Sequence, residues 1–60
     1  MPYINVRVAG ELTAEQKDQI VEEMTSTMER VAGKPKAATY IVIDEVKRTN
    51  WAKGGERLEP

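Results

Sequence analysis

The chemistry of Pro2 depends on its place directly behind Met1. Proline lacks the N–H that a central strand needs, so it is a poor start for the strand-like stretch that follows. Bacterial processing removes Met1 when the second residue is small, and Pro2 would then carry a free secondary amine. A free α-amino group has a pKa of about 7.7–8.0 in peptides, and an apolar surround lowers that pKa. Such an amine could accept a proton as a general base, or form an iminium with a carbonyl.

Two stretches of the sequence predict strands. In residues 3–8, YINVRV, apolar side chains alternate with others, which is typical of a strand with one apolar face. Residues 38–46, ATYIVIDEV, are apolar on both faces, as in strands that are buried on both sides. Asp44 and Glu45 are neighbours in this second stretch and should point to opposite faces, so we do not expect a carboxylate pair there.

Between the two strands the sequence predicts a helix over about residues 14–32. Thr13 and Gln16 match a capping box at its start. Gly33 suits the position after the last turn, and Pro35 blocks continuation. Apolar residues follow at helical spacing, namely Ile20, Val21, Met24, Met28 and Val31. A strand, a helix and a second strand form a βαβ unit with a right-handed crossover.

The length of the chain makes a stable monomer difficult. Sixty residues form one small domain, and a chain of this size buries only about 60% of its unfolded surface. The chain has no Cys and no His, which excludes disulfides and thiolate metal sites. One helix covers one face of a two-stranded sheet, so the other face needs a partner. We therefore expect a homo-oligomer.

The charge and hydropathy of the chain exclude other classes of function. The net charge is −1, with 9 basic and 10 acidic residues interspersed, which is unlike a nucleic-acid-binding surface. No apolar run approaches the roughly 20 residues of a membrane span, and we find no signal-peptide pattern. We expect a cytoplasmic protein that contacts neither nucleic acid nor membrane.

The C-terminal segment carries turn residues around a single tryptophan. Turns are expected at Thr49-Asn50 and at Gly54-Gly55, with a hairpin or hook around Trp51. The neighbours of Trp51 in the sequence are polar and are not expected to cover it. We expect Trp51 to pack against another subunit or to line a site.

Several segments, taken together, resemble the 4-oxalocrotonate tautomerase family over nearly the whole chain. The resemblance implies an α/β (α+β) fold, a single domain over residues 1–60, in which a βαβ protomer ends in a C-terminal hairpin. It also implies that dimers assemble into a hexamer, and that Pro2 catalyses keto–enol tautomerisation of a small enol or dienol carboxylate without a cofactor. The segments are MPYI, LTAEQKDQIVEEMTSTM, GKP, IVIDEV and NWAKGGE.

The resemblance also implies where a substrate would bind. Family members carry two catalytic arginines at positions that hold Leu12 and Tyr40 here. Tyr40 keeps one O–H donor. Leu12 offers only apolar contact to a substrate, or has only a structural role at the start of the helix. The family's active-site aromatic aligns with Trp51, which could instead be an interface anchor. Lys36 is a candidate for carboxylate contact, and Arg48 and Lys53, on either side of Trp51, could reach the mouth of a site.

Two alternatives remain open from the sequence. The chain could act as a hydratase, dehalogenase or decarboxylase on a small unsaturated acid, within the same family. It could also be an oligomeric interaction protein without catalytic activity.

Overall fold

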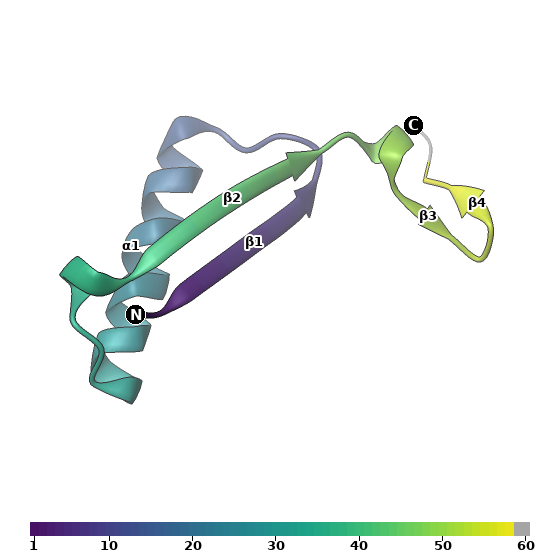
Figure 1. The fold of residues 1–60 in the computed structure, drawn as a ribbon. Helices are drawn as coiled ribbons and strands as arrows, with labels where there is room; N and C mark the ends of the chain where they lie inside the picture. Colours follow the sequence, from purple (N-terminus) through teal and green to yellow (C-terminus); the bar gives the residue numbers. More distant parts are fainter. Residues whose placement is uncertain (59–60) are drawn as a thin grey trace.

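A parallel pair of strands crossed by one helix forms the body of the protein, and a small hairpin follows it (Figure 1). The computed structural model describes residues 1–58. The predicted βαβ fold with a C-terminal hairpin is confirmed. Its elements are β1 (Tyr3–Ala9), α1 (Ala14–Ala32), a 3₁₀ turn (Lys36–Ala38), β2 (Tyr40–Val46), a second 3₁₀ turn (Arg48–Asn50), β3 (Ala52–Lys53) and β4 (Glu56–Arg57).

The helix begins and ends where its capping residues predict. The Thr13 hydroxyl oxygen accepts a hydrogen bond from the Gln16 N–H at 3.1 Å, and the Gln16 side-chain oxygen accepts one from the Thr13 N–H at 2.9 Å. At the other end Gly33 adopts a left-handed φ of 67° and its N–H bonds to the Glu29 carbonyl. These contacts satisfy backbone groups that a helix otherwise leaves unpaired.

Strands β1 and β2 pair in parallel, from Tyr3 opposite Tyr40 to Ala9 opposite Val46. Paired residues of a parallel sheet point to the same face, so the register divides the side chains into two sets. One set faces α1, and it comprises Ile4, Val6, Val8, Ile41, Ile43 and Glu45. The other set, which we call the open face, comprises Tyr3, Asn5, Arg7, Tyr40, Val42 and Asp44.

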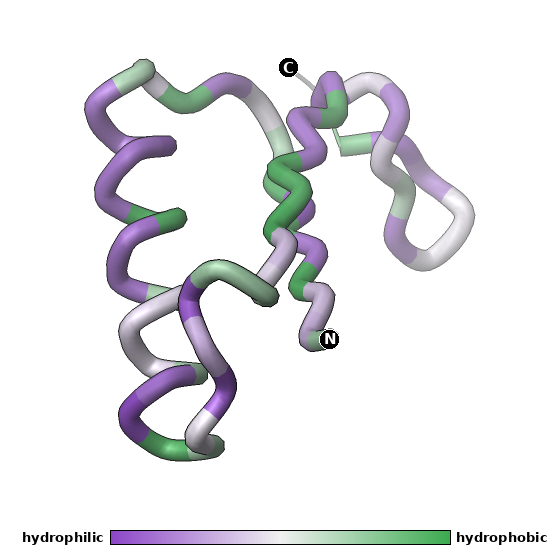
Figure 2. The backbone as a smooth tube through the Cα atoms, turned by 60° about the vertical axis from the view of Figure 1, so that its left-hand side comes forward, coloured by the Kyte–Doolittle hydropathy of each residue, from purple (hydrophilic) through white to green (hydrophobic). Residues whose placement is uncertain are grey.

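The open face is partly apolar although α1 leaves it uncovered. Tyr3 is 62% exposed, Tyr40 57% and Val42 46%. Figure 2 shows hydrophobic positions along β1 and β2, whereas α1 is mostly hydrophilic with hydrophobic positions at intervals. The expectation that a second apolar sheet face lacks a cover within the protomer is confirmed.

Both main strands differ at one end from the sequence prediction, and β1 extends to Ala9 rather than ending at residue 8. The second strand begins at Tyr40 rather than at residue 38, because Pro35 initiates a 3₁₀ turn in which the Ala38 N–H bonds to the Pro35 carbonyl. The turn expected at Thr49-Asn50 is part of the second 3₁₀ turn. Gly54 and Gly55 have φ values of 62° and 86° and connect β3 to β4, since this hairpin turn needs two positive φ angles.

The isolated protomer lacks an enclosed core. None of the residues that the structure describes is fully buried. The radius of gyration is 14.4 Å, whereas a compact domain of this length has about 10.4 Å. The accessible surface is 4813 Å², against about 3,900 Å² for a folded monomer of this mass. Within residues 1–58, no helix combines the length and apolar composition that crossing a membrane requires.

Candidate active site

Pro2 is held at the start of the sheet by a backbone hydrogen bond. Its carbonyl accepts the Tyr40 N–H at 2.9 Å, directly before the first pair of the β1–β2 register. Pro2 is half-buried, whereas Met1 is 89% exposed. With Met1 present the Pro2 nitrogen is an amide, so only the loss of Met1 gives it a basic lone pair. The sheet thus anchors, through its carbonyl, the residue that carries the predicted base.

Tyr40 lies beside Pro2 in the backbone, and Lys36 begins the 3₁₀ turn that precedes β2. The Tyr40 side chain is on the open face. Pro2 is half-buried and comes one residue before Tyr3, so by the alternation of the strand it belongs to the side of the sheet that faces α1. The Lys36 Nζ lies 3.8 Å from a Glu22 carboxylate oxygen, and both side chains are more than half exposed. This loose ion pair leaves Lys36 mobile enough to change partners.

Leu12 lies at the opposite end of the sheet, in the connection between β1 and α1. Its N–H donates a 2.7 Å hydrogen bond to the Glu45 carboxylate. A cavity of about 640 Å³ opens beside it, and its wall carries three cationic and two acidic side chains. The lining residues are Gly10, Glu11, Leu12, Lys17, Glu45, Lys47 and Arg48.

Trp51 follows the second 3₁₀ turn and lies at the same end of the sheet as Leu12. Together with Asn50 and Val46 it lines a shallow cavity of about 300 Å³ that also includes Arg7 and Asp44 of the open face. Trp51 is half-buried within the protomer, where residues of β1 and β2 lie beside it, so the covering does not come from its polar sequence neighbours alone. Its role as a subunit contact or site wall stays a prediction. The Trp51 Nε1 is enclosed and finds no hydrogen-bond acceptor within residues 1–58.

Replacing Trp51 by Phe should therefore leave stability unchanged or slightly raise it. An enclosed donor without a partner costs about 1–3 kcal/mol, and Phe removes the donor while it keeps an aromatic ring. Trp51→Ala should destabilise by about 2 kcal/mol, because the ring contacts are lost. Denaturant unfolding followed by circular dichroism measures both variants, since Trp51 is the one tryptophan of the chain. Equal destabilisation by Phe and Ala would mean that the indole N–H has an acceptor in the assembled protein.

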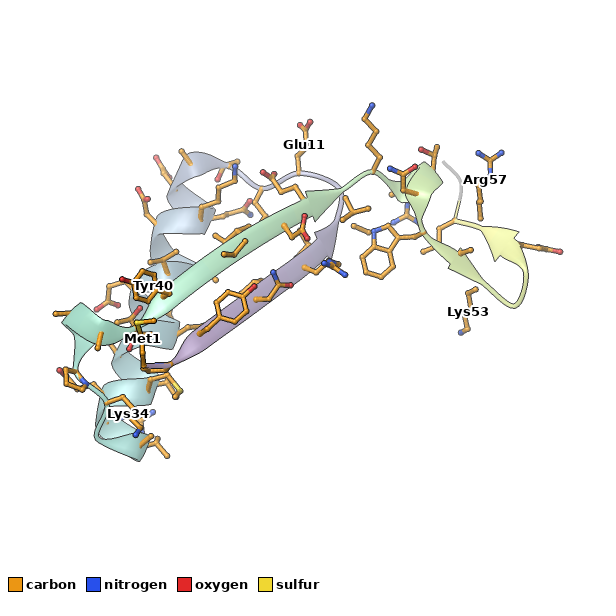
Figure 3. All side chains as sticks on the ribbon, in the orientation of Figure 1. Met1, Glu11, Lys34, Tyr40, Lys53 and Arg57 are labelled. Carbon is orange, nitrogen blue, oxygen red and sulfur yellow. The ribbon has the colours of Figure 1, made fainter. Side chains whose placement is uncertain are left out.

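One protomer does not bring the predicted site residues together. Pro2, Tyr40 and Lys36 are at the N-terminal end of the strands, and Leu12 and Trp51 are beyond their C-terminal end. The seven residues of β1 separate the two ends, a distance of about 20 Å at the usual rise per residue. In Figure 3 Met1 and Tyr40 accordingly lie far from Glu11 and from Lys53 of the hairpin. A site that contains all five residues requires more than one copy of the chain.

The two carboxylates expected on opposite faces are indeed separated. Asp44 accepts hydrogen bonds from Arg7 Nε and Nη2 at 3.0 and 2.9 Å on the open face. Glu45 instead forms a 2.7 Å ion pair with Lys17 of α1. The contacts of Glu45 with Leu12 and Lys17 were not predicted from the sequence, which shows Glu45 only as the neighbour of Asp44. Within residues 1–58, no group of three or more acidic residues could hold a metal ion.

Comparison with known proteins identifies the family of the chain. The family model for tautomerase enzymes matches residues 2–60. The chain belongs to the tautomerase family. It is a tautomerase enzyme, and its matched region begins at the proline that the sheet holds in place.

Individual tautomerases agree with this assignment. The probable tautomerase K2 of Dickeya dadantii (strain 3937) is 42% identical over 59 residues, which cover 97% of this chain and 88% of that protein. The 2-hydroxymuconate tautomerase of Bacillus subtilis (strain 168) is 31% identical over 58 residues, which cover 97% and 94%. The crystal structure of YwhB, a homologue of 4-oxalocrotonate tautomerase, superposes with a TM-score of 0.88 at 30% identity, covering 95% of this chain and 93% of that one.

Proposed function

We propose that this tautomerase transfers a proton within a small enol or dienol carboxylate and uses the free amine of Pro2 as the base. The observation that carries this proposal is the position of Pro2. Its carbonyl accepts the Tyr40 N–H at 2.9 Å, which ties this residue to the sheet in a chain of the tautomerase family. A base carried by an anchored residue needs less reorganisation before it takes a proton.

The reaction needs one base and no cofactor. The neutral Pro2 amine takes the proton of the enol hydroxyl, and the electron pair shifts along the conjugated system. The resulting ammonium returns the proton at carbon, which gives the conjugated keto acid and restores the neutral amine. The Tyr40 and Pro2 side chains of one protomer lie on opposite faces of the sheet, so in the proposed site a Tyr40 of another copy donates its O–H to the developing oxyanion. Trp51 supplies an apolar wall that keeps the amine uncharged.

We infer that the active form is a homo-oligomer, and we propose a hexamer built from dimers. Three observations support an assembly: no described residue is fully buried, the open face exposes Tyr3, Tyr40 and Val42, and the proposed site residues lie at opposite ends of the protomer. In the assembly, one copy would present Pro2 to the Leu12 and Trp51 of others.

The proposal predicts which enol acids are good substrates. Leu12 stands where family members hold a substrate carboxylate with arginine, so a monoacid such as phenylenolpyruvate should be turned over better than the diacid 2-hydroxymuconate. Loss of a charge-assisted contact costs about 1.5–3 kcal/mol, or roughly 10- to 100-fold in kcat/KM. Steady-state kinetics on both substrates measures the ratio.

The 2-hydroxymuconate tautomerase of Bacillus subtilis, assayed in parallel, is the natural reference for the diacid. A clear preference of this protein for the diacid would contradict the role given to Leu12. The cations of the adjacent cavity, Lys47 and Arg48, would then be the groups to replace. Absence of turnover with both acids would contradict the proposed function itself.

A further inference from the structure

The connection between β1 and α1 is tied to the C-terminal end of β2 at two points. The Gly10 N–H donates to the Val46 carbonyl at 2.8 Å, and the Leu12 N–H donates to the Glu45 Oε2 at 2.7 Å. The first bond extends the strand ladder, but the second depends on a side chain. The position of Leu12 is therefore set by a residue 33 places away in the sequence.

The two carboxylate oxygens of Glu45 have different partners. Oε2 accepts the Leu12 N–H, and Oε1 forms an ion pair with the Lys17 Nζ, also at 2.7 Å. The hydrogen bond from Lys17 and, next, that from the Leu12 N–H lower the pKa of Glu45 below its usual 4.5. Glu45 is therefore ionised at neutral pH, with both oxygens occupied, and is poorly suited to act as a base.

The same contacts shape the wall of the cavity of about 640 Å³, because Leu12, Glu45 and Lys17 all line it. A backbone N–H held by a carboxylate limits the movement of the residue that carries it. If Glu45 loses this contact, Leu12 and the cavity wall are free to shift, although the β1–β2 ladder remains.

We propose that Glu45 is a positioning residue, which fixes the backbone of Leu12 so that this side chain forms part of the substrate-binding wall. This inference rests on the proposed function, in which Leu12 occupies the place where family members hold a substrate carboxylate with arginine. Glu45 itself does not touch the reacting atoms. Its loss should weaken binding of substrate and transition state equally, and so raise KM while kcat stays the same.

The test compares three variants that differ only in the acceptor offered to Leu12. Lys17→Met removes the ion pair and leaves the Glu45 contact with Leu12. In that background, Glu45→Gln keeps a side-chain oxygen of nearly the same reach, and Glu45→Met keeps the volume without an acceptor. Using the Lys17→Met background prevents an unpaired Lys17 from binding the substrate. Met also suits the apolar helix side of β2, so the variant is expected to fold.

Two measurements are made on the processed oligomer. Amide hydrogen exchange by NMR should be slow at Leu12 in Lys17→Met and in its Glu45→Gln derivative, and fast in its Glu45→Met derivative. With phenylenolpyruvate, KM should rise about tenfold in the Glu45→Met derivative, as expected for one lost charge-assisted contact, while kcat changes by less than about twofold. The Gln derivative should stay close to Lys17→Met.

The outcomes separate this inference from the proposed function. Equal KM values in the Gln and Met derivatives would overturn the positioning role, whatever the exchange rates. Equal exchange at Leu12 would show that Glu45 does not hold the backbone. Failure of Pro2 as the base would appear elsewhere, as equal turnover by protein with and without Met1, and would leave the exchange result unchanged.

Discussion

Protein that retains Met1 should turn over enol acids about 10²–10⁴-fold more slowly than processed protein, which is the usual contribution of a general base. Retention converts the Pro2 nitrogen from an amine into an amide without a basic lone pair. The fold should not change, because Pro2 joins the sheet through its carbonyl, a group that the removal of Met1 leaves intact. Mass spectrometry identifies each form, and kcat/KM is compared at equal oligomer size.

Pro2→Ala is the matched variant for this comparison. It leaves a primary amine of different basicity and more freedom, so its activity should lie between those of the two forms. The kcat/KM of processed protein should rise with pH through the pKa of the Pro2 amine, since only the neutral amine accepts a proton. Equal rates for both forms would show that Pro2 is not the base.

Val42→Asp should abolish assembly and, with it, nearly all activity. Val42 is 46% exposed at the centre of the open face, so the charge is tolerated in a free protomer. If the open face is buried between two copies, however, each introduced carboxylate without a partner destabilises the assembly by several kcal/mol. Separate protomers would hold Pro2 about 20 Å from Leu12, at the usual rise along β1.

Val31→Asp is the control for this variant, since Val31 is 71% exposed near the end of α1 and lies outside the open face. Sedimentation at micromolar concentration should show an oligomer for the wild-type protein and for Val31→Asp, and a smaller species for Val42→Asp. A Val42→Asp protein that stays assembled and active would mean that the open face is not the interface. A stable wild-type monomer would contradict the assembly as a whole.

The sequence by itself determined the elements of this fold, because the signals that specify them are local. The alternation in residues 3–8 specifies β1. The capping box of Thr13 with Gln16, and Gly33 at the other end, define a helix whose observed bounds are those predicted. The family can also be recognised from the sequence, since the tautomerase family model matches residues 2–60. The start of β2 was misplaced by two residues because the 3₁₀ turn after Pro35 competes with the strand.

Only the tertiary structure decided which of these residues lie together. The β1–β2 register places Pro2 beside Tyr40 in the backbone and leaves their side chains on opposite faces. The fold also separates Pro2 from Leu12 and Trp51 along the length of the sheet. The bond from the Leu12 N–H to Glu45 joins residues 33 apart in sequence, and no local pattern reports it. Contacts of this kind depend on strand pairing and on the crossover of α1, so they arise only when the chain has folded.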